Sequence, residues 1–229
     1  MASRHLENKV KFDALNQKGG YYYKDYEDAK IRTIVLNTSD CYILDVNGNP
    51  SINPMDVYLG QKQFDWIIDK ALNFTDKGTD KSNWGVVVIS HASLNPAESG
   101  TIFKNIIANI FNAYFTGTSY TGTETASGIT INVTCDFTTQ GAMEFICSFG
   151  GHLHYDRVLN YVFGRPHIDI LNALTSVATS TLPSGATRPL VREKGTLSAE
   201  AIDIVSINKT TRTITCTRFG AGADRVINY

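Results

Sequence analysis

The sequence predicts a mixed α/β fold (α/β or α+β) in which strands outnumber helices. One observation is the continuous apolar run at residues 84–89, which is typical of a strand in a sheet covered on both faces. A second is the helical spacing of apolar residues in segments 60–73 and 101–115. A third is a set of strand-like segments before, between and after these helices, because interleaved elements indicate α/β or α+β folds.

The first half of the chain supplies two further strands. Residues 21–26 and 31–36 are rich in aromatic and β-branched side chains, so we expect strands around a turn at residues 27–30. The expected helix at residues 60–73 has one apolar face, formed by Phe64, Ile67, Ile68, Ala71 and Leu72.

The second half is richer in strands. Residues 116–128 are dominated by Thr, Gly and Ser, and we expect a loop without packed structure of its own. Strands are expected at residues 129–135 and 145–149. A C-terminal hairpin is expected over residues 201–218, with its turn at residues 208–210.

One domain spanning residues 1–229 is expected, because the sequence shows no internal repeat and no clear boundary, and this length can bury one large core. Residues 1–20 are polar and mixed in character, and we expect them to be flexible. Residues 161–174 are compatible with either a helix or strands. Residues 180–195 contain prolines and glycines and are expected to be irregular.

Composition argues against several functions. A formal net charge of −1 gives no general attraction to nucleic acid or to an anionic membrane. No apolar stretch approaches the length that spans a bilayer, and the N-terminus lacks the apolar segment of a secretory signal.

The four cysteines form no Cys-x-x-Cys pair, so a disulfide scaffold is not expected. Cys135, Cys147 and Cys216 lie in apolar or β-branched runs and are expected to be buried thiols that pack as small hydrophobic groups. Such usage favours a reducing compartment.

Three of the five histidines follow expected strands. His91 follows the apolar run at residues 84–89, and Gly150-Gly151-His152-Leu153-His154 follows the run at residues 145–149. In an extended backbone, His152 and His154 would project to the same side, and the glycines would allow a turn or a close approach by a ligand. Functional groups gather at the carboxyl ends of strands, and neutral imidazole is the commonest metal ligand. We therefore interpret His91, His152 and His154 as parts of a metal site, the alternative being polar strand-end residues that bind no metal.

Other polar residues near these motifs have simpler interpretations. Asp136 and Asp156 are carboxylates close in sequence to the histidines, and Asp156 could bind metal, orient a histidine or remain a solvated loop residue. His5 and His167 are expected in the N-terminal segment and at a surface or turn position. Arg192 and Arg225 could meet a phosphate, although surface ion pairs are the simpler expectation.

With these elements placed, the chain resembles the calcineurin-like metallophosphoesterases, in particular the sub-group found in phages and prophages. The resemblance rests on the strand pair at residues 21–38, the helix start at residues 60–66, Val87-Val88-Ile89-Ser90-His91, Gly151-His152-Leu153-His154 and the tail at residues 217–225. The fourth of these stretches fits the family's last metal motif, Gly-His-x-His. Together they cover nearly the whole chain.

The resemblance implies part of an αββα two-sheet sandwich and a metal-dependent phosphoester hydrolase. His91 and His152 would bind one divalent ion and His154 a second, with Mn, Zn, Fe or Ni as candidates. Two such ions clamp a phosphoryl group and generate a hydroxide nucleophile. A phage-encoded protein of this kind would act in the host cytoplasm or be associated with the virion.

The family's first three metal motifs, Asp-x-His, Gly-Asp-x-x-Asp and Gly-Asn-His-Asp/Glu, are absent from the sequence. The chain therefore resembles only the C-terminal half of such an enzyme, and no catalytic residue can be assigned. Three hypotheses follow. The site is completed by a longer product or a partner chain; the chain is a catalytically inactive structural or interaction protein that self-associates or binds a partner; or Met1 is not the natural start of the protein.

Overall fold

The computed structural model describes residues 11–12, 20–38, 40, 43–44, 50–51, 59–94, 103–126, 128–152, 154–162, 165–170, 186, 193 and 195–229. Within these ranges the fold is mixed α/β, with several sheets and few helices, as the sequence predicts. Most of residues 1–20 and 180–195, together with Cys41 and Arg192, lie outside the described residues.

A seven-stranded sheet forms the centre of the molecule, in the order β1-β2-β3-β6-β9-β11-β10. The four middle strands are parallel to one another, and the strands at both ends of the sheet are antiparallel to their neighbours. Because the middle strands are parallel, their carboxyl ends meet at one edge of the sheet. The strands are β1 (Lys11–Phe12), β2 (Tyr22–Tyr26), β3 (Ile31–Leu36), β6 (Gly85–Ser90), β9 (Glu144–Gly150), β10 (Arg157–Val162) and β11 (Arg165–Asp169).

One face of this sheet is covered by helices. The expected helix at residues 60–73 is found as α2 (Gln61–Trp66), which continues as the π-helical turn η1 (Ile67–Ala71). The second expected helix is α3 (Lys104–Thr116). Between them runs the 3₁₀ segment η2 (Thr75–Asn83). Phe64, Ile107 and Phe111 of the helices pack with Val86 and Val88 of β6 in the main hydrophobic core.

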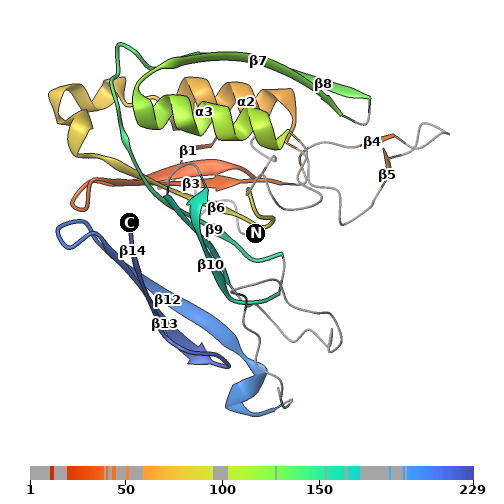
Figure 1. Ribbon diagram of the computed structural model, residues 1–229, viewed down its shortest axis with the longest axis vertical. Helices are drawn as coiled ribbons and strands as arrows, with labels where there is room; N and C mark the ends of the chain where they lie inside the picture. The colour runs from red at the N-terminus through yellow and green to blue at the C-terminus, as the bar shows by residue number, and fades with distance from the viewer. Residues whose placement is uncertain are drawn as a thin grey trace.

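A hairpin covers the outer side of the helices (Figure 1), formed by β7 (Ser119–Ala126) and β8 (Ile129–Asp136). The expected loop at residues 116–128 is therefore wrong over most of its length. Thr fits a pleated strand well, and every second residue of β7 is exposed while its neighbours are partly buried. On the outer face, threonine hydroxyls of the two strands bond across the pair, as in the 2.9 Å contact of Thr125 with Thr130.

A second, three-stranded sheet packs on the other face of the central sheet (Figure 1). It contains the expected hairpin, β12 (Ala201–Asn208) and β13 (Thr213–Gly220), and also β14 (Arg225–Asn228). Val87 of β6 faces this layer, where Ile214, Cys216 and Ile227 meet Cys147 and other residues of the central sheet. Residues 85–88 are buried because the strand is covered on both faces.

Cys135, Cys147 and Cys216 are buried free thiols, as expected. Burial raises the pKa of each of the three thiols.

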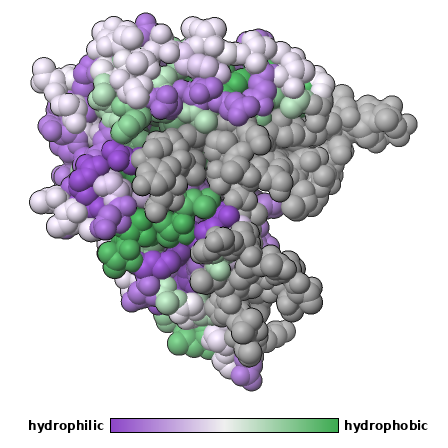
Figure 2. All heavy atoms as spheres, in the orientation of Figure 1, coloured by the Kyte–Doolittle hydropathy of each residue, from purple (hydrophilic) through white to green (hydrophobic). Residues whose placement is uncertain are grey.

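Figure 2 shows hydrophobic side chains gathered along the junction of the two sheets. Within the described residues, no helix covers the outer face of the three-stranded sheet, where Ile204 and Val226 are 64% and 70% exposed. The layers in the described part of the chain are thus the β7–β8 hairpin, the helices, the central sheet and the three-stranded sheet.

Residues 157–162 and 165–169 form the strand pair β10 and β11, with an irregular register between Leu159 and Val162. The described part of the ambiguous region at residues 161–174 is therefore strand at residues 161–162 and 165–169, and residues 163–164 and 171–174 lie outside the described residues. Three very short elements complete the described chain: β4 (Ile43–Leu44), β5 (Pro50–Ser51) and the 3₁₀ turn η3 (Leu197–Ala199). No helix within the described residues is long and apolar enough to cross a membrane.

Candidate functional site

The carboxyl edge of the parallel strands carries a pocket of about 440 Å³. Ligands of open α/β sheets bind at this edge, so it is the first place to look for a site. The pocket is mostly apolar, and its lining comes from the ends of β3, β6 and β9 and from the residue after β11. The lining residues are Val35, Leu36, Ile89, Ser90, His91, Phe149, Gly150, Gly151 and Ile170.

His91 and His152 come together at this edge and form what we call the histidine pair. The backbone N–H groups of Gly151 and His152 both donate to the carbonyl oxygen of His91, each at 2.9 Å. The two rings then meet nearly edge to face, with centroids 5.0 Å apart and an interplanar angle of 76°. His152 Nδ1 lies 3.1 Å from His91 Nε2. His91 and His152 are 61 positions apart in the sequence, and these main-chain hydrogen bonds hold their side chains in direct contact.

His154 lies in a different backbone state from the one expected. The motif does not continue β9 as an extended strand, since His152 is in a turn and His154 has the left-handed φ of 55°. Partial burial lowers the pKa of His152, and the positive charges of His91 and His154 lower it further. A neutral His152 keeps a ring nitrogen lone pair available to a ligand at neutral pH.

Within the described residues, no group of three or more His, Cys, Asp or Glu side chains is arranged to hold a metal ion. Asp136 ends β8 on the exposed hairpin, where its carboxylate accepts hydrogen bonds from the backbone and hydroxyl of Thr138. Asp136 therefore does not join the histidine pair as a third candidate metal ligand.

Asp156 is buried and is therefore not a solvated loop residue. It belongs to a buried charged cluster, which we define as Asp156, Asp203, Arg218 and Arg225. Arg218 donates to both oxygens of Asp156, at 2.7 and 3.0 Å, and to both oxygens of Asp203, at 2.6 and 3.1 Å. Arg225 also pairs with both aspartates. The cluster ties the start of β10 to the three-stranded sheet, and Arg225 has a structural role rather than a surface position.

The expectation that His167 lies at the surface or in a turn is wrong. His167 is on β11, paired with Ser148 of β9, and its side chain is fully buried. Its Nδ1 lies 2.7 Å from Ser148 Oγ, and its Nε2 lies 2.9 Å from Ser93 Oγ and 3.1 Å from Asp169 Oδ1. The preceding proline suggested a turn, but Pro166 is simply the second residue of the strand. The spacing of His167 and Asp169 puts both on one face of the strand, a signal that was available in the sequence.

Gly150 ends β9 directly above this histidine. A Cβ added there would lie 3.2 Å from both His167 Nε2 and Asp169 Oδ1. The absent side chain thus allows the strand to approach His167 and Asp169, and neither Gly150 nor Gly151 has the positive φ of a sharp left-handed turn.

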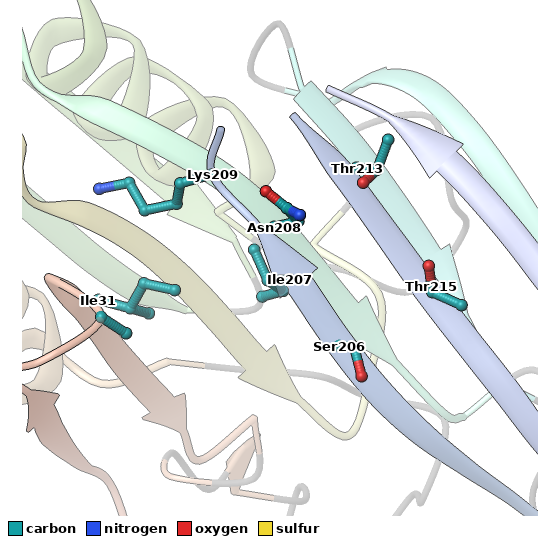
Figure 3. Close-up of a pocket in the computed structure, with 8 residues that line it drawn as sticks. Ile31, Ser206, Ile207, Asn208, Lys209, Thr213 and Thr215 are labelled. Atoms are coloured by element: carbon teal, nitrogen blue, oxygen red, sulfur yellow. The ribbon is translucent and has the colours of Figure 1, made fainter. Parts of the chain in front are cut away.

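A second pocket, of about 540 Å³, lies at the opposite end of the parallel strands (Figure 3). It is formed where the start of β3 meets the end of the β12–β13 hairpin, and Ile31, Ser206, Asn208, Lys209 and Thr215 help to line it. The Lys209 ammonium donates to the backbone oxygens of Lys30 and Asn83, so its charge is used to fasten the hairpin to the central sheet.

No family model and no curated protein matches the chain. Among solved structures, a dimetal phosphatase from Danio rerio matches with a TM-score of 0.43 and 13% sequence identity, over 100% of this chain and 68% of that chain. An overlap this loose does not transfer the neighbour's metals or activity to this chain.

Proposed function

We propose that the chain is part of a metal-dependent phosphoester hydrolase in which the histidine pair binds one divalent ion, while His154 belongs to a second metal position. The observation that carries this proposal is the close contact of two imidazole nitrogens at the carboxyl edge of a parallel sheet, beside a pocket. The Gly-His-x-His motif that brings His152 there is the second support.

The nitrogen separation fits two ligands of one ion. Zinc–imidazole bonds of about 2.0–2.1 Å at a tetrahedral angle place the two nitrogens about 3.3 Å apart. The separation of His152 Nδ1 and His91 Nε2 is 3.1 Å. The distance therefore suits two ligands of one ion, and binding would replace the hydrogen bond between the nitrogens as the rings turn toward the ion.

A bound ion would polarise a phosphoryl oxygen and lower the pKa of a coordinated water. The residues of this chain would do the rest: the histidine pair would hold the ion, and Ile89, Phe149 and Ile170 would form apolar walls beside it. Two imidazoles leave further coordination positions open. We assign these to water, substrate and a carboxylate-bearing segment supplied by a longer polypeptide or a partner chain. Zn, Mn, Fe and Ni are the candidate ions.

The second candidate function is a catalytically inactive structural or interaction protein on the same scaffold. The specific observation in its favour is that no described carboxylate accompanies the histidine pair. The apolar outer face of the three-stranded sheet also fits self-association. A phage origin and a location in the host cell or virion stay predictions.

Metal titration followed by a hydrolysis assay tests the proposal. The full chain is stripped with chelator and titrated with Zn²⁺, Mn²⁺ or Co²⁺ by calorimetry, alongside H91A, H152A and the exposed hairpin variant T121A as control. We expect one ion to bind to the wild type and T121A, and binding to weaken at least tenfold in each histidine variant.

Hydrolysis of bis(p-nitrophenyl) phosphate is then measured with the same proteins. The assay is repeated with each protein made as part of a longer polypeptide that carries additional upstream sequence. Metal-dependent turnover that disappears in H91A and H152A supports the hydrolase. Binding without turnover under both conditions favours the inactive scaffold. Absence of binding in the wild type, or equal binding in all variants, overturns the metal site.

A further inference from the structure

Beneath the histidine pair lies a fully buried polar network, which we define as His167, Ser93, Ser148, Asp169 and Arg157 and call the His167 network. Ser93, Ser148 and Asp169 are also almost completely buried. Buried polar side chains are costly unless they are hydrogen-bonded, and each of these has a partner within 3.1 Å. A network of this kind is rigid because breaking any one bond leaves a buried group unsatisfied.

The network joins the chain segments that carry the two histidines of the pair. Ser93 stands two residues after His91, and Ser148 stands four residues before His152. His167 contacts both serines at once, one through each ring nitrogen. The ring thus bridges the two segments beside the main-chain bonds that already pair β6 with β9.

The orientation of the His167 ring is fixed by its neighbours. A carboxylate can only accept a hydrogen bond, so the contact with Asp169 places a proton on Nε2. Nδ1 contacts the hydroxyl of Ser148 at 2.7 Å, so both ring nitrogens are engaged. Asp169 is itself held by Arg157, which donates to its other oxygen from Nε at 3.1 Å and from Nη2 at 3.0 Å.

Gly150 connects the network to the site. A Cβ at this residue would lie 3.2 Å from His167 Nε2 and Asp169 Oδ1, and the next two residues donate to the His91 carbonyl. A change in the position of the His167 ring therefore acts on the main chain that carries His152.

We propose that His167 is a positioning residue, which holds the orientation of the histidine pair by bridging the two segments that carry it. This inference rests on the proposed function where metal binding is concerned, because the pair is then the ligand set that His167 positions. Outer partners of metal ligands typically change metal affinity about 10–100-fold when they are removed.

The test uses three variants of the full chain. His167→Phe keeps a planar ring but removes every hydrogen bond. His167→Gln replaces Nε2 by an amide that can still donate to Ser93 and Asp169. Ile214→Ala, in the buried core of the other sheet, is the control for lost stability without a change at the network.

Co²⁺ affinity and the visible absorption of the Co²⁺ complex report the geometry of the pair, and urea unfolding reports stability. We expect H167F to bind Co²⁺ about 10–100-fold more weakly with an altered spectrum, H167Q to recover most of the affinity, and I214A to keep both wild-type properties. If H167F binds as the wild type does and loses only stability, the positioning role is refuted.

Nuclear Overhauser contacts between the ring protons of His91 and His152, measured without metal, separate this inference from the proposed function. If the wild type binds no Co²⁺, the proposed metal site is refuted, and the ring contacts alone then test the positioning role of His167. They are expected in the wild type, H167Q and I214A and lost in H167F. Their persistence in H167F overturns the inference.

Discussion

Replacing Arg218 by Met should destabilise the protein more than any single surface change. The Arg218 side chain is 1% exposed, and its guanidinium makes four hydrogen bonds to Asp156 and Asp203. Burial lowers the pKa of Arg218, but its hydrogen bonds to Asp203 and Asp156 outweigh this effect and hold the pKa above its ordinary value.

The magnitude follows from the charges left behind. The charged cluster holds two arginines and two aspartates, so it is neutral, and R218M leaves one buried negative charge without a counter-charge. Removing one partner of a buried ion pair costs about 3–5 kcal/mol. Because Arg225 can still pair with both aspartates, we expect a loss near the lower end, about 3 kcal/mol. That is a large share of the roughly 5–15 kcal/mol by which domains are stable.

Urea unfolding of the wild type, R218M, D156N and the double variant measures this cost. Neutralising Asp156 removes the unpaired charge that R218M creates, so the double variant should be more stable than the sum of the single effects predicts, by about 0.5–3 kcal/mol. A loss below about 1 kcal/mol in R218M, or strict additivity in the double variant, would refute the reasoning about buried charge.

Three further predictions concern other parts of the fold. Arg32→Met should cost about 3–5 kcal/mol in urea unfolding, because the buried guanidinium pairs with Asp25 and donates to the carbonyl oxygens of Ala71 and Asn73. A stability loss as small as that on substituting an exposed lysine would contradict this. Burial raises the pKa of Asp25, but hydrogen bonds from Arg32 and Lys77 outweigh it and hold the pKa below 3.8. The stability from this carboxylate is therefore complete above pH 3.8 and lost as the pH falls through its folded-state pKa; unfolding from pH 2 to 6 should be less acid-sensitive in D25N. Gly150→Ala should cost about 1–3 kcal/mol in urea unfolding by overpacking, because a Cβ there would lie 3.2 Å from His167 Nε2; unchanged stability would argue against the contact.

The regular elements could largely be predicted, because their patterns are local. The run at residues 84–89 indicated a strand buried on both faces, and Val86 and Val87 do face different layers. The threonine-rich strand β7 was missed because its composition is also typical of loops. Its cross-strand partner, which supplies the bonds that make threonine favourable there, lies outside the segment itself.

The polar site residues could be predicted only where position alone decides. His91 and His152 follow neighbouring parallel strands, and any pair of residues in such positions meets at one edge. The partners of Asp156 and His167 depend on which charged or hydroxyl groups other elements bring to them. Arg218 is 62 residues from Asp156, and Ser93 is 74 residues from His167, so no local sequence pattern predicts either contact.

The contact of the histidine pair does not arise from the alternation of side chains along an extended strand. Alternation along an extended strand would have placed His152 and His154 on one side, but the chain turns after Gly150 and His154 is left-handed. What brings His152 to His91 is the pair of main-chain hydrogen bonds onto the His91 carbonyl, supported by the close approach of Gly150 to the buried ring below. Gly150, the residue before the motif, therefore contributes to this contact as well, since a side chain there would press on His167 and Asp169 next to the backbone that aligns the rings.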